Sequence, residues 1–358
     1  MEITESPKKI LFIRLDKIGD LVCTLPCDEH PLLNSAEKTW IINKGNEFII
    51  KNALPARNFI AIDKKKPWRG FRRLLKFSKE NSFDVAFSFQ SPWWVNMALF
   101  FSGIPFRFGV LSQWHSFLFL NHGLRQKRSQ ALKHEADYNY EIIQQGLLRL
   151  GLATAVETSA TVNSTTNSAP TTATPFLKLR APADDELLKK FELNSKDYII
   201  IHPGMAGSAL NWRQEQYLEL ISLILKNSSK KIVITGTPAD ENYLIKIKQN
   251  YSAHPQVLVL QNKLNTTELL SLLAGSAMVI APSTGVLHLA ASLEIPSIGI
   301  YSPVKVQHPT RWQARGPQAT NLVPDVSCPA QFQCLGKKCQ YFNCMDSITP
   351  EQVFNNLH

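Results

Sequence analysis

The chain has 358 residues, of which 44% are hydrophobic and 19% are charged, a composition typical of a globular protein with room for two cores. No run approaches the roughly 18 apolar residues that a membrane-spanning helix needs. The N-terminus carries Glu2 and Glu5 where a signal peptide has a basic start. These features argue against an integral membrane protein and predict a cytoplasmic one.

The first half of the chain reads as alternating strands and helices. We expect a strand over 8–15, then the turn DKIGD and a helix that begins near Asp20. Further apolar runs with α/β spacing stand at 39–44, 58–63 and 84–89. The apolar run 93–106 is interrupted by polar residues, glycine and proline, which indicates a buried helix end and a turn. A helix is expected over 134–151, and the whole order predicts a parallel sheet.

The net charge of +10 is uneven, because one short segment holds Lys64, Lys65, Lys66, Arg69, Arg72, Arg73, Lys76 and Lys79. Such a cluster attracts polyanions or anionic lipid headgroups. We expect Arg69, Arg72 and Arg73 to bind an anionic acceptor or to face the inner membrane surface, and we expect no nucleic acid. The alternative is a solvated helix that packs on its apolar side.

The second half repeats the α/β pattern after a segment rich in Thr, Ser and Ala, which predicts a linker or insertion over 153–176. Apolar runs follow at 197–204, 230–238, 256–261, 277–285 and 296–303. Four of these five runs end in glycine or proline, which favours a ligand site at the carboxyl ends of the strands. We therefore predict two α/β domains, 1–152 and 177–345, whose parallel sheets face a central cleft, and a C-terminal helix over 346–358.

One strand-end turn is the strongest candidate for a phosphate site. No GxGxxG follows the first strand and no GxxxxGK[ST] occurs, so a phosphate would have to be bound by another motif. In APSTGVLHLAASLEIP a strand ends in a turn of Ser283, Thr284 and Gly285, and the helix that follows carries His288. Free amides and the helix dipole at that point would hold a phosphate. A plain Ser/Thr helix cap is the alternative.

Two other turns follow strands of the second half and are candidates for donor contacts. HPGMAGSALNW supplies Gly204, Ser208 and the nearby Arg213, and glycine lets a backbone approach a ligand closely. The turn TGTPADE could place a hydroxyl or carboxylate against a ribose through Thr235, Gly236, Thr237 and Glu241. An ordinary loop is the alternative for the last of these turns.

The junction of the first strand and first helix holds Lys17, Gly19 and Asp20. An acid there is expected to point toward the predicted cleft. Its alternative is helix capping, because Asp at a helix start stabilises the helix without any chemistry.

Four segments together resemble glycosyltransferase family 9, which contains the ADP-heptose:lipopolysaccharide heptosyltransferases. They are IRLDKIGDLVCTLP, HPGMAGSALNW, LNTTELLSLLAGSAMVIAPSTGVLHLAASLEIPSIGIYSP and CLGKKCQYFNCMDSITPEQV, in the family's order. The resemblance implies a GT-B fold with an N-terminal acceptor domain and a C-terminal donor domain. It also implies metal-independent, inverting transfer from a nucleotide-sugar to an anionic, lipid-linked saccharide.

The resemblance assigns roles to particular residues. Asp20 corresponds to the carboxylate that deprotonates the acceptor hydroxyl, and Thr284 and Gly285 correspond to the turn that receives donor phosphate. Well-known members have Asp where this chain has Ser283, and Lys where it has Leu210. Arg213 could replace that lysine with a different reach. The reaction class is therefore better supported than heptose as the sugar.

Four cysteines near the C-terminus, Cys328, Cys334, Cys339 and Cys344, have the spacing C-x5-C-x4-C-x4-C. This spacing lacks the CxxC pairs of common zinc sites, so we expect free thiols or a structural loop, with zinc as the alternative, and no metal or cofactor in the reaction. The alternatives to sugar transfer are a nucleotide-sugar epimerase of similar architecture and a catalytically weak protein that binds a nucleotide-sugar or anionic lipid.

Overall fold

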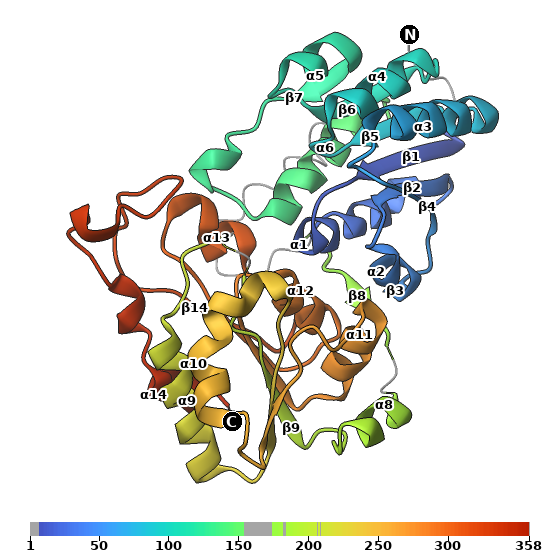
Figure 1. Cartoon of the computed structure of the whole chain (residues 1–358). Helices are drawn as coiled ribbons and strands as arrows, with labels where there is room; N and C mark the ends of the chain where they lie inside the picture. The colour runs from blue at the N-terminus through green and yellow to red at the C-terminus, as the bar shows by residue number, and fades with distance from the viewer. Residues whose placement is uncertain (1–6, 154–173, 182–183, 206, 208, 358) are drawn as a thin grey trace. The chain divides into compact units, whose positions relative to one another are not determined.

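The computed structural model describes residues 7–153, 174–181, 184–205, 207 and 209–357. These residues divide into two compact units (Figure 1). The described parts of Met1–Lys127 and Glu135–Leu177 form unit 1, and those of Arg128–His134 and Lys178–His358 form unit 2. Most of the expected linker, residues 154–173, lies outside the described residues.

Unit 1 is built on a parallel sheet with the strand order β4-β2-β1-β5-β6-β7. Its strands are β1 (Lys9–Arg14), β2 (Glu37–Asn43), β4 (Asn58–Ile62), β5 (Val85–Ser88), β6 (Phe106–Val110) and β7 (His122–Leu124). The central strands are buried along most of their length, as expected for a parallel sheet that is covered on both faces. The strand order reverses between β1 and β5, which is where open α/β sheets bind ligands.

Aromatic residues form a ladder across one face of this sheet. The ring of Phe12 stacks on Trp40 of β2 at 5.0 Å and on Phe87 of β5 at 5.5 Å, and Phe87 stacks on Phe108 of β6 at 5.2 Å. The strand register pairs the same residues. Helix α6 (Glu135–Arg149) reaches this face at Gly146, where an added Cβ would lie 2.6 Å from the Phe87 ring. The expected helix over 134–151 is therefore present.

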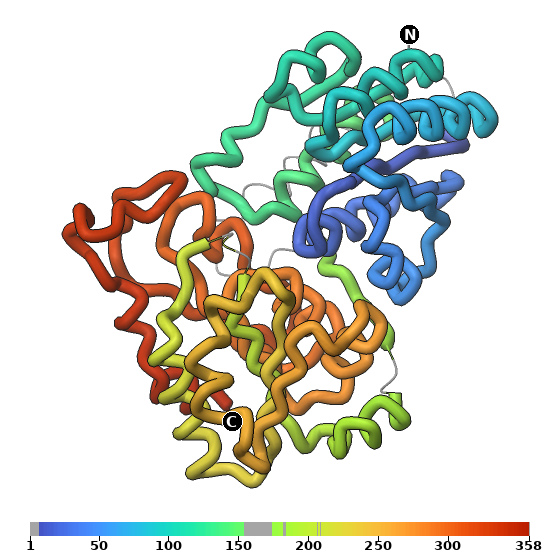
Figure 2. Tube along the Cα trace, in the orientation of Figure 1, coloured from blue at the N-terminus to red at the C-terminus, as the bar shows by residue number. Residues whose placement is uncertain are grey.

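Helices α3 (Pro67–Asn81) and α4 (Trp93–Phe101) pack side by side, as Figure 2 shows. Leu74 of α3 and Leu99 of α4 share a core with Leu11 and Ile13 of β1. Gly70 lets the two helices approach, because a Cβ there would lie 2.8 Å from the Trp94 ring. The other elements of unit 1 are α1 (Ile18–Val22), η1 (Leu25–Glu29), η2 (Pro31–Leu33), α2 (Glu47–Lys51), β3 (Ala53–Leu54) and α5 (Trp114–Phe119).

Unit 2 repeats the arrangement with the parallel strand order β11-β10-β9-β12-β13-β14. The strands are β9 (Tyr198–Ile201), β10 (Lys231–Ile234), β11 (Val257–Val259), β12 (Met278–Pro282), β13 (Ser297–Ile300) and β14 (Ala319–Leu322). Here the order reverses between β9 and β12. The turns proposed from the sequence as donor contacts therefore begin at the ends of β9, β10 and β12, around the expected binding point.

The helices of unit 2 include a C-terminal helix that packs on α9 and adds Val353 to the core. They are α8 (Asp185–Lys190), α9 (Gln214–Asn227), α10 (Glu241–Tyr251), α11 (Thr266–Gly275), α12 (Gly285–Ser292), α13 (Pro309–Trp312) and α14 (Pro350–Asn355). Shorter elements are η3 (Arg128–Gln130), β8 (Lys178–Leu179), η4 (Pro238–Asp240), η5 (Lys305–Gln307), η6 (Gly336–Lys338) and η7 (Cys344–Ser347).

Two expectations differ from this arrangement. Residues 128–134, placed in the first domain from the sequence, belong to unit 2, where His134 Nε2 lies 2.9 Å from the carbonyl oxygen of Gln313. The run 93–106, expected to be buried, exposes Phe100 and Phe101 at the end of α4. Within the described residues, no helix is long and apolar enough to cross a membrane.

Candidate active site

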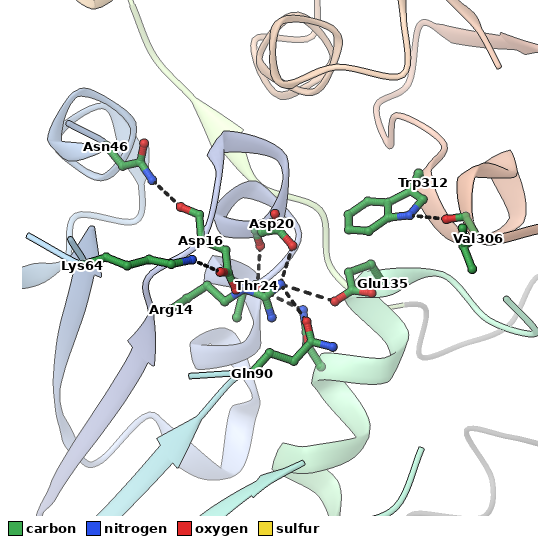
Figure 3. Close-up of polar contacts among 11 residues, drawn as sticks. Arg14, Asp16, Asp20, Thr24, Asn46, Lys64, Gln90, Glu135, Val306 and Trp312 are labelled. Carbon is green, nitrogen blue, oxygen red and sulfur yellow. Dashed lines mark hydrogen bonds and ion pairs between the residues drawn. The ribbon is translucent and has the colours of Figure 1, made fainter. Parts of the chain in front are cut away.

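The first candidate site lies where β1 ends in unit 1, around a fully buried arginine (Figure 3). Arg14 is the last residue of β1, and the chain then turns into α1. Its Nη2 atom lies 2.5 Å from Oδ1 of Asp20, and its Nε atom lies 3.2 Å from Oδ2 of Asp16. One buried cation therefore fixes two carboxylates of the DKIGD turn.

Two further side chains reach the same guanidinium from other elements. Nη2 of Arg14 lies 3.5 Å from Oε1 of Glu135, in the first turn of α6, and donates to Oε1 of Gln90 at 3.3 Å. Gln90 follows β5 with a left-handed φ of 49°, which strains a residue other than glycine. The group therefore joins the ends of β1 and β5 at the reversal of strand order.

The charges around Arg14 determine its protonation. Burial would lower the pKa of the guanidinium, but the nearby charges of Asp20, Glu135 and Asp16 outweigh burial and raise the pKa above the ordinary value of arginine. Arg14 therefore stays a cation, and Lys64 adds a second one by donating from Nζ to Oδ1 of Asp16 at 2.6 Å. Removal of one charge from a buried cluster of this kind is expected to lower stability, because the remaining charges are then less well compensated.

Asp20 is held at one oxygen and open at the other. Its Oδ1 contacts Arg14, and among the described residues no donor is recorded for Oδ2. The side chain is partly exposed. Asp20 stands in the first turn of α1, whose N-cap position is Lys17, and its carboxylate contacts Arg14. Its backbone carbonyl accepts from Thr24, whose hydroxyl in turn accepts from Asn139.

The predicted acceptor residues lie on two elements of unit 1. Lys17 and Gly19 precede Asp20 at the start of α1, and Lys17 is exposed. Arg69, Arg72 and Arg73 are exposed on α3, and no carboxylate is paired with them within the described residues.

Sequence reasoning missed Arg14, Gln90 and Glu135. Arg14 could have been found from the sequence, because a charged residue inside an apolar strand is almost never buried unless it is paired. Glu135 and Gln90 could not be linked to Arg14 from the sequence, because they lie 121 and 76 residues from it along the chain.

The second candidate site lies in unit 2, where β12 runs into α12. Thr284 occupies the N-cap position of α12, yet its side chain makes no capping hydrogen bond. Its Oγ1 atom is buried and has no hydrogen-bond partner among the described residues. Gly285 begins the helix, and Ser283 beside it is half-buried. The hydroxyl is thus available to a ligand at the first turn of the helix.

Two histidines lie near the strand ends of unit 2. His288 is buried one turn into α12. His202 follows β9, and its Nδ1 lies 3.0 Å from the hydroxyl of Thr235, which follows β10. Burial lowers the pKa of His202 to about 4, although the charge of Asp240 opposes the shift. His202 is therefore neutral near pH 7 and serves as a hydrogen-bonding residue.

The turn after β10 is held by its own hydrogen bonds. The carboxylate of Asp240 accepts from the amide of Thr237 at 2.8 Å and from its hydroxyl at 2.7 Å. Asp240 also fills the space in front of Gly204, where an added Cβ would lie 2.1 Å from its Cγ. Gly204 therefore has a packing role that the sequence did not reveal. Glu241 pairs with Lys248 at 2.6 Å.

The remaining donor candidates occupy separate environments. A Cβ at Gly236 would meet Leu244 of α10 at 2.7 Å, so this glycine allows close packing. Arg213 forms a two-pronged pair with Asp346, at 3.1 Å from Nε and 2.7 Å from Nη2. Its charge is therefore already compensated within unit 2. Ser208 lies outside the described residues.

The C-terminal cysteines are free thiols that lie near one another. Burial raises the pKa of Cys344, and the neighbouring Cys328, Cys334 and Cys339 raise it further. In the part of the chain that the structure describes, no group of three or more His, Cys, Asp or Glu residues is arranged to hold a metal ion.

Comparisons with known proteins agree on one family. A model of glycosyltransferase family 9 (heptosyltransferase) matches residues 71–341. The lipopolysaccharide core heptosyltransferase OpsX of Haemophilus influenzae is 24% identical over 305 residues, which cover 84% of this chain and 80% of that protein. The family model confirms the resemblance drawn from the four sequence segments.

Solved structures show the same fold. A family 9 glycosyl transferase from Veillonella parvula superposes with a TM-score of 0.76 at 17% identity, covering 99% of this chain and 98% of that one. The ADP-heptose lps heptosyltransferase II of Escherichia coli superposes with a TM-score of 0.72 at 15% identity, covering 98% of this chain and 97% of that one. The predicted fold class, α/β of the GT-B type with a parallel sheet in each unit, is confirmed.

Proposed function

This chain belongs to glycosyltransferase family 9 and is a glycosyltransferase, and we propose that it moves heptose or a related sugar from ADP-heptose to a lipopolysaccharide core-type acceptor. The names of its relatives support this sugar and this acceptor, since they include a lipopolysaccharide core heptosyltransferase and an ADP-heptose heptosyltransferase. Ser283 and Leu210 differ from well-known members of the family, so a related sugar stays within the proposal.

The observation that carries the mechanism is the state of Asp20. Arg14 fixes Oδ1 at 2.5 Å, and Oδ2 has no recorded donor among the described residues. In this proposal, Oδ2 accepts a proton from an acceptor hydroxyl. That hydroxyl oxygen then attacks the anomeric carbon, the bond from this carbon to the diphosphate oxygen breaks, and the configuration inverts. A single displacement of this kind needs one base and no second carboxylate.

The donor is assigned to unit 2 in this proposal. The hydroxyl of Thr284 and the first amides of α12 would donate hydrogen bonds to the diphosphate, because a helix start favours negative charge. They would also stabilise the charge that develops on the leaving diphosphate. Exposed Thr237 and Glu241, in the turn after β10, are the residues proposed for the ribose.

The acceptor is assigned to unit 1. Lys17 at the start of α1 and the exposed arginines of α3 would bind its anionic groups. A lipid-linked acceptor also brings the enzyme to the cytoplasmic face of the inner membrane. No metal or cofactor takes part in this scheme.

The deciding experiment replaces Asp20 with Asn. The substitution keeps the shape and removes the base, so we expect turnover to fall by about 10²- to 10⁴-fold while donor affinity stays nearly unchanged. Turnover at saturating acceptor, a donor titration and a melting curve are measured on one preparation. Analysis of the product distinguishes a transferred sugar from an isomerised one.

Asp16→Asn is the matched control, because it removes the same charge from the same arginine. We expect it to lower turnover far less than Asp20→Asn does. Near-normal turnover of a folded Asp20→Asn protein, or equal losses in both variants, would overturn the assignment of the base.

A further inference from the structure

Helix α5 of unit 1 is oriented with its polar residues inward. His115 and Ser116 are buried, whereas Trp114, Phe117 and Leu118 are 66%, 51% and 61% exposed. Nδ1 of His115 lies 3.0 Å from Nδ2 of Asn96 in α4, and Asn96 accepts in turn from Ser88 at 2.7 Å. Buried hydrogen bonds therefore hold α5 in a position that leaves its apolar side chains in solvent.

Helix α4 also presents an apolar outer face. It contains no charged residue, and its polar residue Asn96 is buried. Phe100 and Phe101 are 44% and 53% exposed, and half-buried Trp93 lies on the same side at helical spacing. An apolar face of this kind is an informative departure from ordinary surfaces, on which large apolar residues are scattered singly.

Aromatic contacts link α4 to its neighbouring helices. The ring of Phe100 lies 5.3 Å from Phe101 and 5.7 Å from Phe119 of α5, and α4 packs against α3 on its other side. Trp93 contacts Trp68 of α3 at 5.5 Å. We call the exposed set on α4 and α5 the aromatic surface: Phe100, Phe101, Trp114, Phe117 and Leu118.

The charge around the aromatic surface is positive. Residues 85–127 contain no Asp or Glu. The guanidinium of Arg107 lies 5.4 Å from the Phe100 ring, and that of Arg125 lies 5.2 Å from the Phe117 ring. On the adjacent α3, Arg72 and Arg73 are exposed, and no carboxylate is paired with them among the described residues.

We propose that the aromatic surface is a membrane-docking site that enters the interfacial layer of a bilayer containing anionic lipids. Trp and Phe side chains favour the boundary between headgroups and acyl chains, and arginines beside them bind the lipid phosphates. This inference rests on the proposed function, which brings the enzyme to a membrane, and it names the surface that docks there. Neither Asp20 nor the donor site takes part in docking, so a vesicle assay without substrate tests the surface apart from the chemistry.

The charge pattern favours a bilayer over a second copy of the chain. Two copies that met through this surface would bring their arginine borders together, and like charges at an interface weaken association. An anionic bilayer offers both an apolar layer and the opposite charge.

The test uses the full chain and no substrate. Binding is measured by sedimentation with vesicles of phosphatidylcholine mixed with phosphatidylglycerol, and with vesicles of phosphatidylcholine alone. We expect binding to the mixed vesicles, and we expect Phe117→Ser combined with Leu118→Ser to weaken it by about tenfold or more. Phe332→Ser is the matched control, because Phe332 is a similarly exposed aromatic residue of unit 2.

A second measurement reports directly on how deeply the tryptophan side chains enter the bilayer. Brominated lipid should quench tryptophan fluorescence of the unaltered chain, and Trp114→Phe should lose part of that quenching. Melting curves identify a variant that has not folded, and the single substitution Phe101→Ser then replaces the α5 pair. Unchanged vesicle binding by the folded α5 or Phe101 variant, or an equal loss in the Phe332 control, would overturn the proposal. So would a dimer in light scattering that the α5 variant dissociates while vesicle binding stays the same.

Discussion

Arg14 compensates three carboxylates from inside unit 1, and Glu135 is as fully buried as the arginine itself. Each of these buried charges needs compensation, since an unpaired buried charge is far more costly than an exposed one. The same residue holds Asp20 at the distance described above. Arg14 therefore contributes both to the stability of unit 1 and to the position of the proposed base.

We predict that Arg14→Met lowers the free energy of unfolding by about 3–5 kcal/mol, because it removes the buried cation that compensates Asp16, Asp20 and Glu135. Urea unfolding measures the change. Glu135→Gln in the same protein should restore part of the stability, since it removes a buried negative charge that Arg14 compensates. Arg213→Met is the comparison, because its pair with Asp346 is exposed and should contribute no more than about 1 kcal/mol. Similar losses at the two arginines would contradict this account.

At the scale of helices and strands, much of the fold follows from the sequence. The apolar runs predicted both parallel sheets because strands that are buried on both faces need nearly continuous apolar residues. The turn carrying Thr284 was also predicted, since a strand-to-helix junction fixes where free amides lie. The outward face of α4 was not predicted, because an apolar run looks the same whether it faces a core or solvent.

The site around Arg14 could also be predicted only in part from the sequence. Asp20 could be found from its position after the first strand, whereas the approach of Glu135 depends on how α6 packs in the folded unit. The role of Gly204 was also beyond the sequence, because it depends on Asp240 filling the space in front of it.

Helix α3 offers a test of the acceptor assignment. We predict that Arg72→Glu combined with Arg73→Glu raises the Michaelis constant for an anionic acceptor, most strongly at low salt, where surface charges are least screened. Steady-state kinetics at two salt concentrations measure the effect. Lys337→Glu combined with Lys338→Glu makes the same change in net charge on exposed residues of unit 2 and should leave the constant nearly unchanged. Equal responses of both variants would indicate a general charge effect.

For the whole molecule, the proposed chemistry makes a prediction about metals. We predict that turnover survives chelation, because the proposed donor turns lack the clustered carboxylates typical of a magnesium–diphosphate site. Turnover is measured with excess EDTA and again after magnesium is added. A complete loss that magnesium reverses would contradict the prediction. Unfolding by EDTA that zinc reverses would instead assign a structural metal to the four cysteines.

The hydroxyl of Thr284 has a consequence for the ligand-free protein. A buried polar group without a partner lowers stability by about 1–3 kcal/mol, and among the described residues this oxygen has none. Folding therefore leaves a hydrogen bond unmade at the start of α12, and a bound anion would complete it. The same unmade hydrogen bond would therefore lower the stability of the ligand-free protein and add to its affinity for an anion.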